Sequence, residues 1–144
     1  MIRIYQQTII VSPEVIDGNG HVNNTIYLHW MQDIVIAHSS ANGWSPERYQ
    51  EIKAGWFARS HYLEYLRPTF ASDQLMIRTW VSGFARTRSI RQDQIDRCQT
   101  VIFQAQTEWV YFDLHRQRPD RPPCNLVESF EVLTELNVIE RENL

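Results

Sequence analysis

The sequence has few cysteines, no long apolar run and no excess of basic residues. Its two cysteines, Cys98 and Cys124, lie far apart without CxxC spacing, which argues against a disulfide scaffold and predicts reduced thiols in a cytosolic protein. No stretch approaches the roughly 20 apolar residues that a membrane-spanning helix requires, so we expect no membrane span. The formal net charge of −3 argues against a general nucleic-acid-binding protein.

The composition is ordinary for a globular protein. Of the 144 residues, 43% are hydrophobic and 22% are charged, which is enough apolar material for one buried core. We therefore expect residues 1–144 to form a single domain. The first residues, Met1–Gln7, lack the apolar region of a secretory signal and alternate in the manner of a strand.

The most informative stretch is a glycine-punctuated turn at residues 17–24, with the sequence DGNGHVNN. It combines one carboxylate, one imidazole and three side-chain amides, and a strongly apolar helical pattern follows it. A helix that begins near Asn24 or Thr25 would present free backbone N–H groups and a partial positive charge close to Asp17. Such a helix end suits acyl transfer, because its amide donors stabilise a developing oxyanion.

The remaining pattern predicts helices first and strands later in the chain. Residues 26–41 carry apolar side chains on most sides of a helix, which predicts a buried helix that ends near Gly43. Ser45 and Pro46 indicate the start of a short second helix. Strands are predicted where residues alternate or where aromatic and β-branched residues gather. These segments are 2–11, 56–66, 75–84, 88–96 and 101–114.

These elements indicate an α+β fold. The last four strands are joined by short links, so we expect them to form an antiparallel meander. Residues 126–136 are predicted to form a terminal helix. A sheet needs cover on its inner face, and the long apolar helix is the only large apolar object available. We therefore expect a five-stranded antiparallel sheet that curls around a long central helix.

Residues 17–27 resemble the Asp-x-x-Gly-His-Val-Asn-Asn-x-x-Tyr motif of hotdog-fold acyl thioesterases, in the 4-hydroxybenzoyl-CoA thioesterase-like branch. Further similarities follow in chain order over residues 3–130, among them Leu63–Pro68, Asp73 and Ser89. The spacing of the acid, amide and imidazole is also similar to that of plant acyl-carrier-protein thioesterases. The resemblance implies a hotdog fold that hydrolyses an acyl-CoA or acyl-carrier-protein thioester to a free acid and a thiol.

The resemblance implies that Asp17 carries catalysis. As a nucleophile it would attack the thioester carbonyl, and as a general base it would activate a water molecule. The backbone N–H of Asn24 is the candidate oxyanion donor, while Asn19 and His21 would position the acid, the carbonyl or the water. A structural alternative exists for Asp17, because aspartate in an Asp-Gly turn is common.

Other charged residues are candidates for lesser roles. Asp33 on the helix and Glu64 on a strand are rival carboxylates. Coenzyme A carries phosphates, so local positive charge is needed to bind it. Two arginine clusters qualify, one between the third and fourth strands and one after the fifth: Arg86, Arg88 and Arg91, then Arg116, Arg118 and Arg121. From these we select Arg86, Arg88 and Arg118 as candidates for phosphate binding.

No separate cofactor is expected, because coenzyme A would enter as part of the substrate. His29, His38 and His61 lack metal-ligand spacing, so no metal site is predicted. Hotdog proteins resemble one another in pairing their sheets edge to edge. An open edge strand must in any case be paired or protected, so we expect a homodimer or a homotetramer.

Two other functions stay open from the sequence. A hotdog hydratase carries an Asp-x-Asn-Pro-x-His arrangement. Residues 17–21 look similar, but His21 comes one residue early and no proline intervenes. The His-Phe-Pro-Gly motif of dehydratases does not occur. A non-catalytic acyl-binding module is the third reading, and in that case Asp17 would be dispensable for ligand capture.

Overall fold

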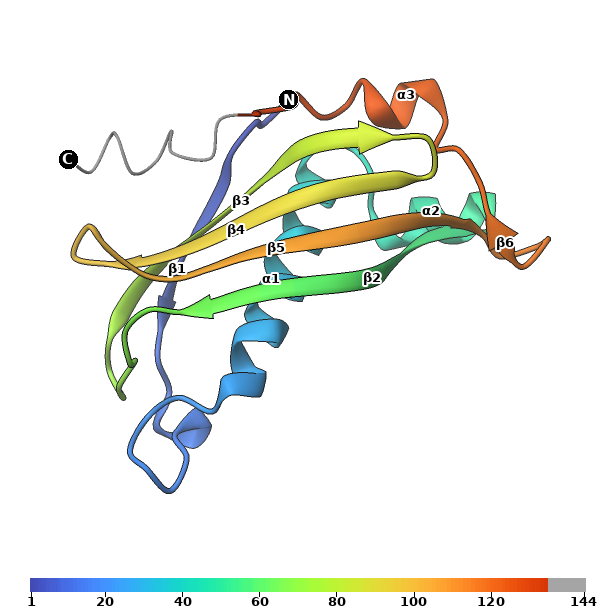
Figure 1. Ribbon diagram of the computed structural model, residues 1–144. Helices are drawn as coiled ribbons and strands as arrows, with labels where there is room; N and C mark the ends of the chain where they lie inside the picture. The colour runs from blue at the N-terminus through green and yellow to red at the C-terminus, as the bar shows by residue number, and fades with distance from the viewer. Residues whose placement is uncertain (135–144) are drawn as a thin grey trace.

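The computed structural model describes residues 1–134, and one curled antiparallel sheet and one long helix dominate it (Figure 1). The long strands are β1 (Tyr5–Ile10), β2 (Ala54–Tyr65), β3 (Gln74–Ala85), β4 (Arg88–Arg97) and β5 (Thr100–Asp113). The long helix is α1 (Asn24–Ala41). The shorter elements are η1 (Pro13–Val15), α2 (Pro46–Ile52), β6 (Arg118–Pro119) and α3 (Cys124–Val127). This arrangement is the expected α+β hotdog fold.

The strand order is β1-β3-β4-β5-β2, and the two-residue β6 pairs with β5. The predicted four-strand meander is therefore wrong at β2, which lies at the far edge beside β5. Tight turns at residues 86–87 and 98–99 join β3 to β4 and β4 to β5, so these strands are neighbours. Residues 66–73 form a longer link, which lets the chain cross to the opposite edge before β3 begins.

Helix α1 begins at Asn24 because the side chain of Asn23 caps it, with Oδ1 accepting the N–H of Thr25 at 3.0 Å. The buried residues Tyr27, Met31, Ile34 and His38 form a single stripe at helical spacing. The prediction of a helix buried on most sides is wrong for the single chain, where Ile36 is 43% exposed. One sheet covers only one face of a helix, so the apolar residues of the other face stay uncovered.

Two apolar clusters lie between the helices and the sheet. The first includes Ile34 of α1 and Ile77 of β3, and the second includes Val81 further along β3. Between the two clusters, β3 carries the buried Thr79 and α1 carries the buried His38. The core therefore contains a polar layer across its middle.

The predicted terminal helix is wrong in most of its described part. Helix α3 ends at Val127, and residues 128–134 are not helical, while 135–136 lie outside the described residues. The N–H of Leu133 donates to the carbonyl of Val81 at 2.9 Å, so this segment lies against β3. Within residues 1–134, no helix is both long enough and apolar enough to cross a membrane.

Candidate active site

The segment between β1 and α1 closes on itself as a small turn. The N–H of Asp17 donates to the carbonyl of His21 at 2.8 Å, and the N–H of Gly20 donates to the carbonyl of Asp17 at 3.1 Å. Ile16 and Val22, which flank this closure, pair as an isolated antiparallel β-bridge. Gly20 has φ of 79°, which only glycine adopts without strain. The backbone therefore brings Asp17, the exposed Asn19 and the exposed His21 into one turn.

The carboxylate of Asp17 is partly buried and organises this turn. Its Oδ1 accepts the N–H of Asn19 at 2.8 Å and the N–H of His21 at 3.4 Å. Among the described residues, no donor reaches its Oδ2. The structural alternative for Asp17 thus accounts for one carboxylate oxygen, and the second stays available to a substrate or a water molecule.

The side chains of Asn19 and His21 do not contact the carboxylate of Asp17 through any hydrogen bond. The ring of His21 instead meets the ring of Phe70 edge-on, with centroids 5.2 Å apart. The turn therefore groups these three residues through its backbone rather than through side-chain pairing. The roles assigned to them stay predictions.

The beginning of α1 lies directly after this turn. Because the cap from Asn23 is directed at Thr25, the N–H of Asn24 finds no acceptor among residues 1–134. The carbonyl of Asn24 accepts the hydroxyl of Tyr65 at 3.2 Å, which ties this helix end to β2. A free N–H at the first helical position, with the positive end of the helix dipole, is a local environment that favours an anion.

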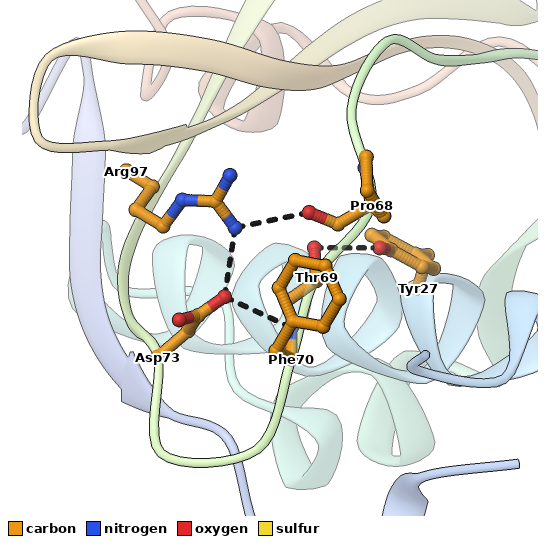
Figure 2. Close-up of polar contacts among 6 residues, drawn as sticks. All are labelled: Tyr27, Pro68, Thr69, Phe70, Asp73 and Arg97. Carbon is orange, nitrogen blue, oxygen red and sulfur yellow. Dashed lines mark hydrogen bonds and ion pairs between the residues drawn. The ribbon is translucent and has the colours of Figure 1, made fainter. Parts of the chain in front are cut away.

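An ion pair between Asp73 and Arg97 holds the link between β2 and β3 (Figure 2). Arg97 donates through Nη1 to Oδ2 of Asp73 at 2.7 Å and to the carbonyl of Pro68 at 2.9 Å. The same Oδ2 accepts the N–H of Phe70 at 2.9 Å. The backbone of Phe70, whose ring meets His21, is therefore held by Asp73, and Arg97 at the end of β4 holds Asp73 in turn.

A second contact ties the link to the helix, as Figure 2 also shows. The buried hydroxyl of Tyr27 donates to Oγ1 of Thr69 at 2.8 Å, and burial raises the pKa of Tyr27. The carbonyl of Thr69 accepts the N–H of Val22 from the turn at 3.0 Å. Sequence reasoning found Asp73 as part of a motif but missed its partner Arg97, because nothing local relates two residues that tertiary folding brings together.

The arginines selected for phosphate binding lie at the opposite end of the sheet. The turn adjoins the beginning of β3, where the N–H of Val11 donates to the carbonyl of Asp73. Arg86 follows the end of β3, and this strand of 12 residues spans about 40 Å. Arg88 and Arg118 begin β4 and β6 at that same distant end. Within one chain the structure therefore does not bring them to Asp17.

Two further charged candidates are engaged elsewhere. Arg91 of the first arginine cluster is buried, and its Nη1 lies 2.8 Å from Nδ1 of His38 and 3.1 Å from Oγ1 of Thr79. Burial and the charge of Arg91 lower the pKa of His38 to about 4. Glu64 accepts from Nε2 of Gln104 at 3.0 Å. Arg91 is therefore not free to bind a ligand, Glu64 has one carboxylate oxygen engaged, and Asp33 is exposed on α1.

A cavity of about 490 Å³ lies between α1 and the strands β2 and β5. Its lining is mostly apolar, and the polar residues of the sheet that reach it are His61, Asp93 and Thr107. The full lining is Leu28, Met31, Gln32, Val35, Trp56, Phe57, Ala58, His61, Asp93, Thr107 and Trp109. Leu28 lies one helical turn beyond Asn24, so the cavity begins close to the end of the helix that carries the free N–H. Asp17 itself does not line this cavity in the single chain.

Asp93 is the residue of this cavity that sequence reasoning missed. It is 2% exposed, and burial raises its pKa to about 7, although Arg91 opposes the shift. Beside it in the lining, Nδ1 of His61 lies 2.8 Å from Oγ1 of Thr107. The polar and charged sequence of β4 gives no sign of burial, because that strand is covered on both faces only in the folded sheet. Within residues 1–134, no three potential metal ligands of the His, Cys, Asp and Glu types lie together.

Residues 11–131 match the family model described as the thioesterase-like superfamily. A hypothetical protein from Staphylococcus aureus, solved in complex with CoA, is 18% identical with a TM-score of 0.83, covering 90% of this chain and 83% of its own. A putative oleoyl thioesterase from Lactobacillus plantarum is 17% identical with a TM-score of 0.85, covering 92% of this chain and 53% of its own. This chain thus spans about half of the Lactobacillus protein.

A 1,4-dihydroxy-2-naphthoyl-CoA thioesterase from Synechocystis has a TM-score of 0.79 at 15% identity, with 88% of this chain and 94% of its own covered. At such identities the likeness to these structures shows a shared fold. None of the curated proteins matches this sequence.

Proposed function

The chain belongs to the thioesterase-like superfamily, and from that membership we propose that it hydrolyses an acyl-CoA or acyl-carrier-protein thioester to a free acid and a thiol. One observation carries the proposal at the level of residues. One carboxylate oxygen of Asp17 accepts no hydrogen bond from a described residue, and the N–H of Asn24 donates none to one. Both groups belong to the turn at residues 17–24, where α1 begins. A general base or nucleophile and an oxyanion donor are the two groups that acyl transfer needs.

In this proposal the thioester carbonyl lies at the beginning of α1. The N–H of Asn24 and the helix dipole stabilise the negative charge that develops on the carbonyl oxygen. Asp17 either takes a proton from the attacking water or attacks the carbonyl itself and forms a mixed anhydride that water then hydrolyses. The C–S bond breaks as the intermediate collapses, and the sulfur leaves as a thiolate that needs little protonation.

We further propose that two copies pair through β2. This edge strand has 12 residues, and it exposes Phe57 and Tyr62 by 50% and 64%. A long, apolar, unpaired edge needs cover. A twofold axis would pair the two β2 strands antiparallel, so the Ala54 end of one protomer would lie beside the Tyr65 end of its partner.

This pairing would bring the two ends of the sheet together across the dimer. The end of β2 at Tyr65 adjoins the turn, because Tyr65 bonds to Asn24. The start of β2 lies at the end of the sheet that carries Arg86, Arg88 and Arg118. Arginines of one protomer would therefore approach the substrate held at the other protomer's turn, where they could bind the phosphates of coenzyme A. Paired dimers would give the alternative homotetramer.

The test is to mix the protein with a panel of acyl-CoA and acyl-carrier-protein substrates and to follow thiol release with a disulfide dye. Asp17→Asn should lose about 100-fold or more in kcat. It should still fold, because the amide oxygen of asparagine can accept the same two N–H groups. Asp33→Asn, which changes an exposed carboxylate outside the turn, is the matched control and should keep full activity. Near-normal turnover by Asp17→Asn would refute the assigned role.

The same panel separates the rival functions. An enoyl-CoA substrate that loses its conjugated absorbance without releasing thiol would identify a lyase. Binding of acyl-CoA with neither reaction, and with no effect of Asp17→Asn on affinity, would identify an acyl-binding module.

A further inference from the structure

The interior contains a carboxylate that no described residue satisfies. Asp93 is 2% exposed, and neither of its oxygens accepts a hydrogen bond within residues 1–134. The indole N–H of Trp109 is also buried and has no partner among those residues. Both side chains line the cavity between α1 and the sheet. Buried polar atoms without partners are rare in folded proteins, and here an acceptor and a donor share one hollow space.

The polar neighbours of Asp93 are occupied by other bonds. Arg91 directs Nη1 at His38 and Thr79. The hydroxyl of Thr79 lies 3.2 Å from the carbonyl of Gln92, to which it donates, and Thr107 pairs with His61. Thr79 lies close enough to hold the pKa of Asp93 down, but its hydroxyl donates to Gln92, and neither carboxylate oxygen accepts a hydrogen bond from the described residues. Arg91, two positions away on the same face of β4, already offsets the charge of Asp93, so the pair has no net negative charge to hold a further cation. A neutral hydrogen-bond donor is the ligand group that fits this position.

Three hollows adjoin one another along α1. Two smaller hollows, of about 230 and 50 Å³, share Val35, Trp56 and Trp109 with the main cavity. Together they follow α1 from Leu28 to Ser39, a distance of about 16 Å along the helix axis. The space begins one turn beyond Asn24. An extended chain fills such a shape along its length better than a single ring does.

We propose that this cavity binds an aliphatic acyl chain that carries a hydroxyl group part-way along it, with that hydroxyl donating to the carboxylate of Asp93. The proposal rests on the proposed function, because it assumes that the thioester lies at the beginning of α1 and that the chain extends from there. A plain hydrocarbon chain would cover the carboxylate without offering a donor. A ligand that leaves a buried group without a hydrogen bond binds more weakly than a ligand that supplies that bond. Asp93 is thus a residue that sets specificity for the acyl group.

The experiment compares dodecanoyl-CoA with a series of its hydroxylated isomers that differ only in the position of the hydroxyl. The wild-type protein should hydrolyse one or two mid-chain isomers with a kcat/KM about 10- to 100-fold above that of dodecanoyl-CoA, the range expected when a ligand meets a buried acceptor that would otherwise be left unpaired. Asp93→Leu should abolish the preference, and Asp93→Asn, whose amide oxygen still accepts, should keep part of it. The control is Asp96→Asn on the same strand, because Asp96 pairs with Arg78 on the opposite face of the sheet. It should leave the preference unchanged.

A second readout does not depend on hydrolysis. Calorimetric titration with the free hydroxydodecanoic acids and with dodecanoic acid should give the same order of affinities and the same response to Asp93→Leu. Equal kcat/KM and equal affinity across the series would overturn the proposal, since water alone would then satisfy Asp93. A preference in binding without thiol release from any substrate would overturn the proposed function while sustaining the role of Asp93. If Asp93→Leu fails to fold, the comparison of the substrates with the wild-type protein still tests the proposal.

Discussion

Replacing Asn24 with proline removes the proposed oxyanion donor and little else. Proline is favoured at the first position of a helix, where it fixes φ at a helical value and lacks only an N–H that the helix does not use. Asn24 occupies this position. The preceding residue, Asn23, has φ of −58° and ψ of 132°, an extended conformation that a residue before proline adopts readily. The carbonyl that accepts from Tyr65 is retained.

The magnitudes follow from that geometry. Removing one oxyanion donor costs about 3 to 4 kcal/mol of transition-state stabilisation, so kcat should fall about 100- to 1,000-fold. Stability should hold or rise by about 0.4–1 kcal/mol, because proline restricts the unfolded chain and no native hydrogen bond is lost. For a domain of this size that gain corresponds to a Tm increase of up to about 4 °C.

The assay combines thiol release with thermal unfolding for Asn24→Pro and for Asn24→Ala as the matched control. Alanine removes the side chain but keeps the backbone N–H, so its kcat should stay close to that of the wild type. Two results would refute the reasoning. One is near-normal turnover by the proline variant, and the other is an equal loss in both variants, which would assign the effect to the side chain.

Three further predictions concern stability. Asp73→Asn should lower the free energy of unfolding by about 1–2 kcal/mol in a urea titration, because it removes the charge from a half-buried bond to Arg97. Tyr27→Phe should cost about 1–2 kcal/mol in the same titration, since it leaves the buried hydroxyl of Thr69 without its partner. The third concerns His38, whose folded pKa is about 4 against 6.5 unfolded. As pH falls the unfolded chain binds this proton first, so the stability from neutral His38 is complete above pH 6.5 and is lost towards pH 4, by about 3 kcal/mol.

Each of these three predictions has a control that isolates the interaction concerned. For the ion pair, the double variant with Arg97→Gln should cost less than the sum of the single changes, and full additivity would mean that the pair contributes nothing. For Tyr27, the control is Tyr5→Phe, which removes a hydroxyl that meets only the exposed Gln7 at 3.4 Å and should be nearly neutral. An equal loss in both variants would contradict the assigned bond. For pH, the difference between wild type and His38→Gln cancels the opposite titration of Asp93, and a difference that does not change between pH 7 and pH 4 would contradict a buried neutral imidazole.

Local patterns predicted the long helix and the long strands close to their observed bounds, but not the terminal helix. Helix α1 begins at Asn24 and ends before Gly43, because a capping amide and a glycine with φ of 92° act on neighbouring residues only. Strand β4 was expected over 88–96 and is observed at Arg88–Arg97. The closure of the turn at residues 17–21 is also local, since its hydrogen bonds join Asp17 to Gly20 and His21, whereas Val22 is tied to the distant Thr69.

Burial and partners were much harder to predict from the sequence. Arg91 was placed in a cluster of candidate phosphate-binding arginines, yet it is buried and bonded to His38 from another element. Alternation along a strand tells which residues share a face, and it does not tell what covers that face. The pairing of Asp73 with Arg97 depends likewise on two strand ends that meet only after the sheet has formed.

The amino-acid sequence by itself determined the two-residue alternation of the strands, the caps of the long helix and the acid-bearing turn before it, because each results from interactions between near neighbours. Only the tertiary structure decided that β2 lies at the far edge of the sheet, that the candidate arginines lie at the end opposite Asp17, and that Asp93 lines a cavity. These outcomes depend on which strands pair and which faces become covered. The free energy that selects such pairings comes from contacts between residues far apart in the chain, and no local pattern records it.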